Sequence, residues 1–125
     1  MKITEKEKHN RDELFNLMRE NPELPVIPMV DGEIVAGDDF SYWMGSWGEA
    51  RVDEVAIDEW DCEGRILTKT YGEEELIEDI AEIKYDGSDE AYEKAKEDAK
   101  SLWQKVIVVY IGLPDPDMWK SGKEM

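Results

Sequence analysis

The sequence has little cysteine, little histidine and no long apolar run. Cys62 is the only cysteine and His9 the only histidine among 125 residues. An internal disulfide, a thiolate metal site and a histidine-dependent catalytic triad are therefore not expected. No apolar stretch approaches 18 residues, and the charged N-terminus lacks the apolar segment of a signal peptide. We therefore expect a cytoplasmic protein without a membrane span or a disulfide framework.

Basic residues are also scarce. The chain has 15 Lys and Arg against 32 Asp and Glu, for a net charge of −17. Because the sequence-independent affinity for nucleic acids and anionic lipids comes from Lys and Arg, direct binding to either is not expected. The hydrophobic fraction of 41%, with five Trp and five Tyr, is enough for a folded core. The length fits one domain, which we assign to residues 1–112, with a loosely attached tail over 113–125.

Several elements are predicted in the N-terminal half. Thr4 and Glu7 have the spacing of a capping box, which predicts a helix over 4–20. The apolar runs 24–30 and 33–36 flank Asp31-Gly32, a pair typical of a type I′ turn, and this predicts a β-hairpin.

Proline restricts the first strand of that hairpin. Pro25 and Pro28 have no N–H to donate, so the strand is expected at a sheet edge. Extended segments are expected over 40–47 and 51–58, and a turn over 61–64 leads to a returning strand at 65–69.

The C-terminal half has a helical period followed by a buried strand. A helix is predicted from Glu73, ended by Asp86-Gly87, and a second helix is predicted from an N-cap at Ser88 to about Leu102. The unbroken apolar run at 106–111 is typical of a strand covered on both faces, which places it at the centre of the sheet. The predicted fold is a single α+β domain. Its mostly antiparallel sheet has five or six strands, with two or three helices packed largely on one face.

The acidic residues are unevenly distributed. Residues 30–63 contain eleven acids and one base, Arg51, whereas residues 70–98 contain twelve acids and three lysines. In the last helix the lysines partly compensate the acids, but in the strand region nothing does. Two interpretations are open: a solvated acidic surface that serves solubility, or carboxylates spaced on strands in imitation of phosphates.

The acidic strand region supplies the predicted partner-binding residues. Trp43 and Trp103 are expected in the core, while Trp47 and Trp60 fit the core and an interface equally well. The predicted partner-binding residues are Asp38, Asp39, Trp47, Glu49, Asp53, Glu54, Asp58, Glu59, Trp60 and Asp61.

Three short patterns fall short of known catalytic or ligand-binding motifs. Residues 59–64 approach the opening of an EF-hand loop but lack the bidentate glutamate at its twelfth position, so weak divalent cation binding stays an alternative. Glu82-Ile-Lys84 is half of a nuclease pattern, and the glycines of 45–48 lack the lysine of a phosphate loop. We expect no enzyme, no metal site and no cofactor.

Three segments carry a resemblance to a known group of proteins. The segments are NPELPVIPMV (21–30), WMGSWG (43–48) and KVIVVYI (105–111). With the residues around them they resemble short acidic proteins encoded by bacteriophages and prophages of Gram-positive bacteria, over residues 11–60 and 103–112. The resemblance brings no catalytic residues. It implies a phage context inside a bacterial host cell, where small acidic proteins often block defence nucleases.

Two functions are therefore expected. The first is a non-enzymatic inhibitor that imitates nucleic-acid phosphates and occupies the basic channel of a host defence nuclease, such as a CRISPR effector or a restriction enzyme. The alternative is a phage accessory protein that binds another protein through a partly hydrophobic face, with its acidity serving solubility only. In both cases the partner is a host or phage protein, with a basic surface in the first case.

Overall fold

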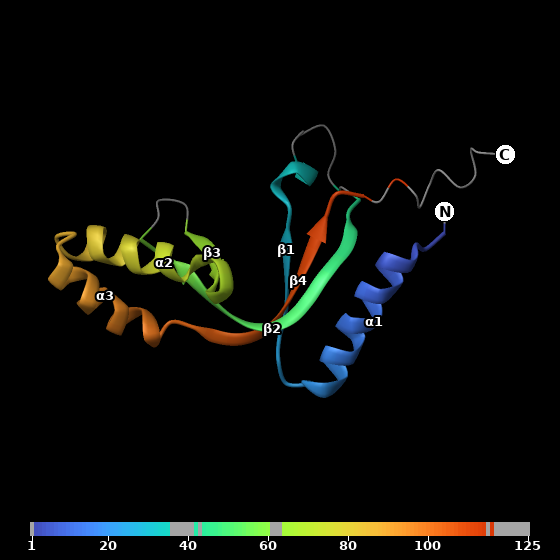
Figure 1. The fold of residues 1–125 in the computed structure, drawn as a ribbon, viewed down its shortest axis with the longest axis horizontal. Helices are drawn as coiled ribbons and strands as arrows, with labels where there is room; N and C mark the ends of the chain where they lie inside the picture. The colour runs from blue at the N-terminus through green and yellow to red at the C-terminus, as the bar shows by residue number, and fades with distance from the viewer. Residues whose placement is uncertain (1, 36–41, 43, 61–63, 115, 117–125) are drawn as a thin grey trace. The chain divides into compact units, whose positions relative to one another are not determined.

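The computed structural model describes residues 2–35, 42, 44–60, 64–114 and 116. These residues form an α+β fold with three α-helices and a four-stranded mixed sheet of strand order β1-β4-β2-β3 (Figure 1). The described residues form four strands and not the five or six that were expected, and the sheet is mixed because β1 (Val26–Val30) runs parallel to β4 (Gln104–Gly112). Residues 33–35 of the segment expected as a strand over 33–36 form none, and residue 36 lies outside the described residues.

The chain divides into two compact units. One contains residues 1–52 and 107–125, and the other contains residues 53–106. Two strands contribute residues to both units, β2 (Ser46–Asp58) and β4. The predicted division into 1–112 and a tail over 113–125 stays a prediction.

The first unit is built around α1 (Glu5–Glu20), which begins where the capping box predicts. The N-cap Thr4 accepts a hydrogen bond from the Glu7 N–H at 3.2 Å. Leu14 of this helix packs against Ala50 of β2 and against Ile107 and Val109 of β4. These side chains are at most 4% exposed, so they form the core of this unit.

The predicted hairpin at Asp31-Gly32 is wrong. The residues after Asp31 form a turn of 3₁₀-helix, η1 (Gly32–Val35), in which the Asp31 side chain accepts the Glu33 N–H at 3.0 Å and its C=O accepts the Ile34 N–H at 3.0 Å. The Asp-Gly pair therefore closes a local side-chain turn, and β1 pairs with β4 from the far end of the chain. As predicted, the strand that contains Pro28 lies at a sheet edge.

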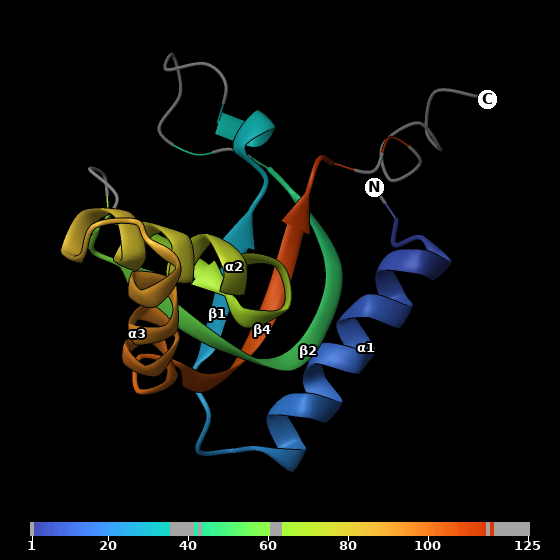
Figure 2. The same ribbon diagram turned by 60° about the vertical axis from the view of Figure 1, so that its left-hand side comes forward.

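β4 lies inside the sheet, between β1 and β2 (Figure 2). Val106, Ile107, Val108 and Val109 are at most 3% exposed. The prediction of an interior strand covered on both faces is therefore confirmed. Its apolar run is continuous because both of its faces are buried.

The second unit pairs the end of β2 with β3 (Arg65–Thr68) in antiparallel register, as predicted. The loop 61–63 between them lies outside the described residues, as do residues 40, 41 and 43 of the segment expected over 40–47, and residues 46 and 47 of that segment begin β2. The buried residues of β2 are Ala50, Ala56 and Asp58, which are an even number of residues apart and therefore lie on the same face of the strand. Ile57 points the other way and is 56% exposed beside its cross-strand partner Ile66.

Helices complete this unit. They are α2 (Lys69–Asp79), the π-helical turn η2 (Ile80–Lys84) and α3 (Asp89–Lys100), and α2 and α3 lie side by side (Figures 1 and 2). The first of them begins at Lys69 and not at Glu73, so the three glutamates 73–75 lie beyond its first turn. Ser88 caps α3 as predicted, accepting the Ala91 N–H at 3.1 Å.

Alanines make the contact between α3 and the rest of this core. Ala91, Ala95 and Ala99 are at most 3% exposed and pack with Leu76 and Ile80 of the preceding helix. Their spacing of four residues places them on one face of α3, and their small size allows close packing. Trp60 and Trp103 are partly buried against the same core.

Candidate partner-binding surface

The predicted binding residues that the structure describes are distributed between both units, and four of their five carboxylates have a partner. In the first unit, Glu49 forms an ion pair with Arg51 at 3.0 Å. In the second unit, Asp53 accepts the Thr70 hydroxyl at 2.7 Å and Glu54 pairs with Lys69 at 3.2 Å. Asp38, Asp39 and Asp61 lie outside the described residues. The acids of β2 are therefore more compensated in three dimensions than along the sequence.

Asp58 is placed in the interior. Its side chain is 0% exposed, its Oδ1 accepts the Trp60 N–H at 3.2 Å, and Arg65 lies 3.9 Å from its Oδ2. Arg65 also lies 3.1 Å from Glu75 and 3.5 Å from Asp79, so one guanidinium forms ion pairs with acids from β2 and α2. Arg65 of β3 therefore links Asp58 of β2 to acids of α2, and the buried Asp58 presents no charge to a partner. Its neighbour Glu59 is exposed.

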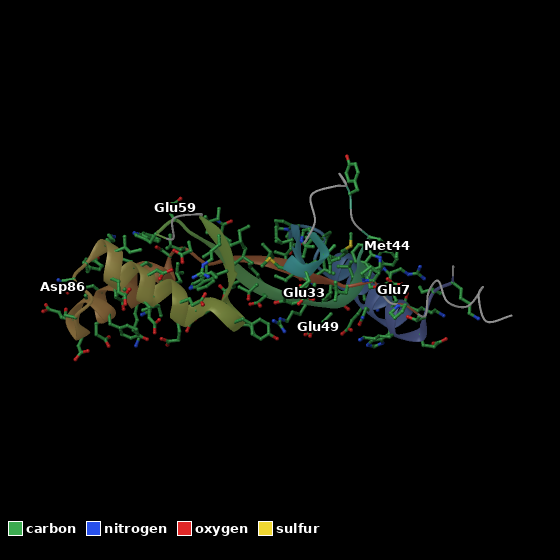
Figure 3. All side chains as sticks on the ribbon, turned by 90° about the horizontal axis from the view of Figure 1, so that it is seen from above. Glu7, Glu33, Met44, Glu49, Glu59 and Asp86 are labelled. Carbon is green, nitrogen blue, oxygen red and sulfur yellow. The ribbon has the colours of Figure 1, made fainter. Side chains whose placement is uncertain are left out.

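Uncompensated carboxylates are found on the helices of the second unit. Residues 53–106 carry 18 acids against seven bases, a net charge of −11 out of −17. Among the described residues, several exposed acids of the helices form no ion pair and no hydrogen bond: Glu78, Glu82, Asp89 and Glu93. Figure 3 shows side chains with oxygen tips around both helices and places Asp86 at the turn between them.

Two of these acids, Glu78 and Glu93, lie near Tyr92, together with Glu74. The Tyr92 hydroxyl of α3 lies 3.0 and 2.7 Å from the two carboxylate oxygens of Glu74 on α2. The hydrogen bond to Glu74 raises the pKa of Tyr92, and burial and the negative charges of Glu74, Glu78 and Glu93 raise it further. We call Glu74, Glu78 and Glu93, with Glu82 and Asp89 one helical turn further on, the acidic helical face.

A second tyrosine ties η2 to α3. Asp98 accepts hydrogen bonds from the Lys84 ammonium at 2.8 Å and from the Tyr85 hydroxyl at 2.7 Å. The hydrogen bond from Lys84, followed by that from Tyr85, lowers the pKa of Asp98, and the same bonds to Asp98 raise the pKa values of Lys84 and Tyr85. These three groups satisfy one another and add little net charge to the surface.

In the first unit, α1 covers a strand edge through two polar side chains. The Glu7 carboxylate, which is 6% exposed, accepts the Trp47 N–H at 3.1 Å, and the Asn10 amide donates to the Trp47 C=O at 3.0 Å. Trp47 itself is 42% exposed. The capping-box pattern identifies Glu7 as part of the N-terminus of α1. No pattern in the sequence indicates its contact with Trp47.

A groove lies beside Trp47. It has a volume of about 900 Å³ and is lined by Lys6 of α1, by Trp47, and by Leu113, Pro114 and Pro116 after β4. Leu113 is 50% exposed.

The described residues contain no group of three or more His, Cys, Asp or Glu side chains arranged to hold a metal ion. Residues 61–63 of the EF-hand-like pattern at 59–64 lie outside the described residues. Within the described residues, no helix combines the length and the apolar character that crossing a membrane requires.

Comparisons of this chain with protein-family models, with curated proteins and with solved structures gave no match.

Proposed function

We propose that this chain is a non-enzymatic acidic binding protein that imitates nucleic-acid phosphates and occupies the basic channel of a nucleic-acid-cleaving defence enzyme, such as a CRISPR effector or a restriction enzyme. The observation that carries the proposal is the acidic helical face, whose carboxylates are exposed and in part without partners. Exposed acids that repel one another reduce stability, and a basic partner would relieve that repulsion. The phage origin suggested by the resemblance is part of this proposal.

The spacing of these carboxylates suits a partner surface that normally binds the phosphates of a nucleic acid. Glu74 and Glu78 are one helical turn apart on α2, as Asp89 and Glu93 are on α3, so neighbouring acids along each helix are about 6 Å apart. Two adjacent helices thus present two rows of negative charge, as the two strands of a duplex do. We place the contact here rather than on β2, because Glu49, Asp53 and Glu54 already have partners and Asp58 is buried.

The test is capture of the partner from a bacterial lysate on the immobilised chain, followed by mass spectrometry. The variant E74Q/E78Q/E93Q removes three charges from the acidic helical face and keeps side-chain size. The matched control E49Q/D53N/E54Q removes three charges from β2. We expect a nucleic-acid-binding protein that duplex DNA displaces, retained by the parent and by the control but lost from the first variant.

Two results would contradict the proposal. One is a captured protein that duplex DNA does not displace. The other is equal retention by the parent and by E74Q/E78Q/E93Q, with circular dichroism showing that both are folded.

A second candidate function rests on the groove beside Trp47. Its exposed apolar side chains, Trp47 and Leu113, fit a protein interaction module whose acidity serves solubility only. In that case Trp47→Ala abolishes capture, while E74Q/E78Q/E93Q and added salt leave it unchanged.

A further inference from the structure

The outer edge of β1 has backbone groups that point away from the sheet. The Ile107 N–H donates to the Pro25 C=O at 2.9 Å, and the Asp31 N–H donates to the Ile111 C=O at 2.9 Å. In a parallel ladder alternate residues turn both backbone groups to the same side, so residues 25, 27, 29 and 31 face β4. The N–H groups of Val26 and Val30 and the C=O groups of 26, 28 and 30 therefore point outward. Pro28 occupies an outward position, where its missing donor costs no bond within the sheet.

The edges of β2 and β1 differ in whether their outward backbone groups have hydrogen-bond partners. On β2, the N–H and C=O of Trp47 are bonded by Glu7 and Asn10 of α1. On β1, no described strand pairs with the outer side, and Val30 is 52% exposed. Exposed edges of this kind commonly carry a charged residue that prevents pairing, but residues 24–30 have no charged side chain in a chain that is 38% charged.

We infer that the outer edge of β1 binds an extended segment of another protein by strand addition, and that this segment has basic residues at both ends. Two donors and three acceptors over five residues are the complement of an extended backbone. Acids flank the strand on both sides, with exposed Glu23 before it and exposed Asp31 and Glu33 after it. Lys or Arg at each end of the added strand therefore faces a carboxylate. This site is separate from the acidic helical face of the second unit and does not depend on it.

A second copy of this chain is a poor occupant of the same edge. Antiparallel pairing centred on β1 places Pro28 opposite Pro28 of the second copy, where neither supplies an N–H. It also brings Glu23 of each copy toward the end of the other copy's β1, where Asp31 and Glu33 lie, and like charges that lie close together repel one another. Each copy further carries a net charge of −17.

The probe is a fluorescein-labelled peptide, Lys-Arg-Val-Thr-Val-Thr-Val-Lys-Arg, titrated against the full chain by fluorescence anisotropy, with amide exchange followed by NMR. Val30→Pro removes one outward donor without breaking a bond to β4, and Val30→Thr keeps that donor while changing the side chain. Pro28→Thr adds a donor. We expect slower exchange of the Val26 and Val30 amides with peptide bound, about fivefold weaker binding for Val30→Pro, about fivefold tighter binding for Pro28→Thr, and little change for Val30→Thr.

Several outcomes would overturn the inference. They are no binding at saturating peptide, binding without protection of the Val26 and Val30 amides, and equal affinity of Val30→Pro and Val30→Thr. Equal binding of a peptide with Glu-Asp flanks would remove the charge argument. Concentration-dependent protection of the same amides without peptide would show that a second copy is the occupant. The variant E74Q/E78Q/E93Q binds the peptide like the parent if the site is β1, and weaker binding by it would place the peptide on the acidic helical face.

Discussion

Gly72 lies inside α2 at a point where the helix has no room for a larger side chain. A Cβ atom at this position would lie 2.8 Å from Cβ and 3.1 Å from Cδ2 of Leu67, which is itself 9% exposed. The nearest atom is the first carbon of that side chain, so a rotamer change at its far end does not relieve the contact. Replacing glycine by alanine inside a helix normally stabilises it by about 1 kcal/mol. Overpacking in a close-packed core costs about 1–3 kcal/mol.

The two effects oppose each other, and the close contact decides the sign. We expect Gly72→Ala to lower the free energy of unfolding by about 0–2 kcal/mol, measured by urea denaturation. In a Leu67→Gly background, which lacks the Cβ and Cδ2 atoms of Leu67, the contact disappears, so the same substitution should stabilise the protein. Gly112→Ala is the matched control, because a Cβ there meets no atom within 4 Å. An increase in stability for Gly72→Ala in the parent, or the same effect in both backgrounds, would refute the reasoning.

Three further predictions concern the cover of β2, acid stability and metals. Glu7→Ala leaves the Trp47 N–H without the acceptor of a part-buried hydrogen bond and should cost about 1–3 kcal/mol in urea denaturation, whereas Glu7→Gln should recover most of the loss. The pKa of Asp98 is lowered from its ordinary value of 3.8 by its hydrogen bonds from Lys84 and Tyr85, so its contribution is complete above that value and is lost as the pH falls through the lower folded-state pKa. Asp98→Asn should therefore show a shallower loss of stability than the parent in this acid range, and a parallel loss would contradict the assignment. EDTA should leave the melting temperature unchanged, and a drop of many degrees would revive a carboxylate metal site.

Local signals predicted those elements whose stability is local. Thr4 and Ser88 cap the helices they precede, as their spacing indicates. The apolar run of β4 is buried, as its unbroken apolar character predicts. In each case the pattern depends on contacts or burial along one element, and such patterns are visible in the sequence.

Elements that depend on distant partners were not predicted. Asp31-Gly32 has the composition of a hairpin turn, but the Asp31 side chain closes a turn of its own and leaves β1 to pair with β4. α2 begins at Lys69, four residues before the predicted start at Glu73. Gly72 lies inside it although glycine is a weak helix former, and its close approach to Leu67 is a packing role that no local pattern displays.

The same limit applies to the candidate surface. Counting along the chain suggested that the acids of 31–63 lack compensation and that lysines of the last helix supply it. In the structure Lys69 forms an ion pair with Glu54, and Arg65 forms ion pairs with Asp58 and with acids of α2. Compensation is therefore a property of contacts between elements, and a running count of charge does not contain it.

The salt dependence of binding to the captured partner tests the central claim most directly. The Debye length falls from about 10 Å at 0.1 M to about 3 Å at 1 M salt, so a contact made of exposed ion pairs should weaken by orders of magnitude over that range. We predict this steep loss for the parent and for E49Q/D53N/E54Q. For E74Q/E78Q/E93Q we predict weaker binding at 0.1 M and a shallower dependence on salt. A parent affinity that does not change with salt, or equal affinity and slope for E74Q/E78Q/E93Q, would contradict phosphate mimicry by the acidic helical face.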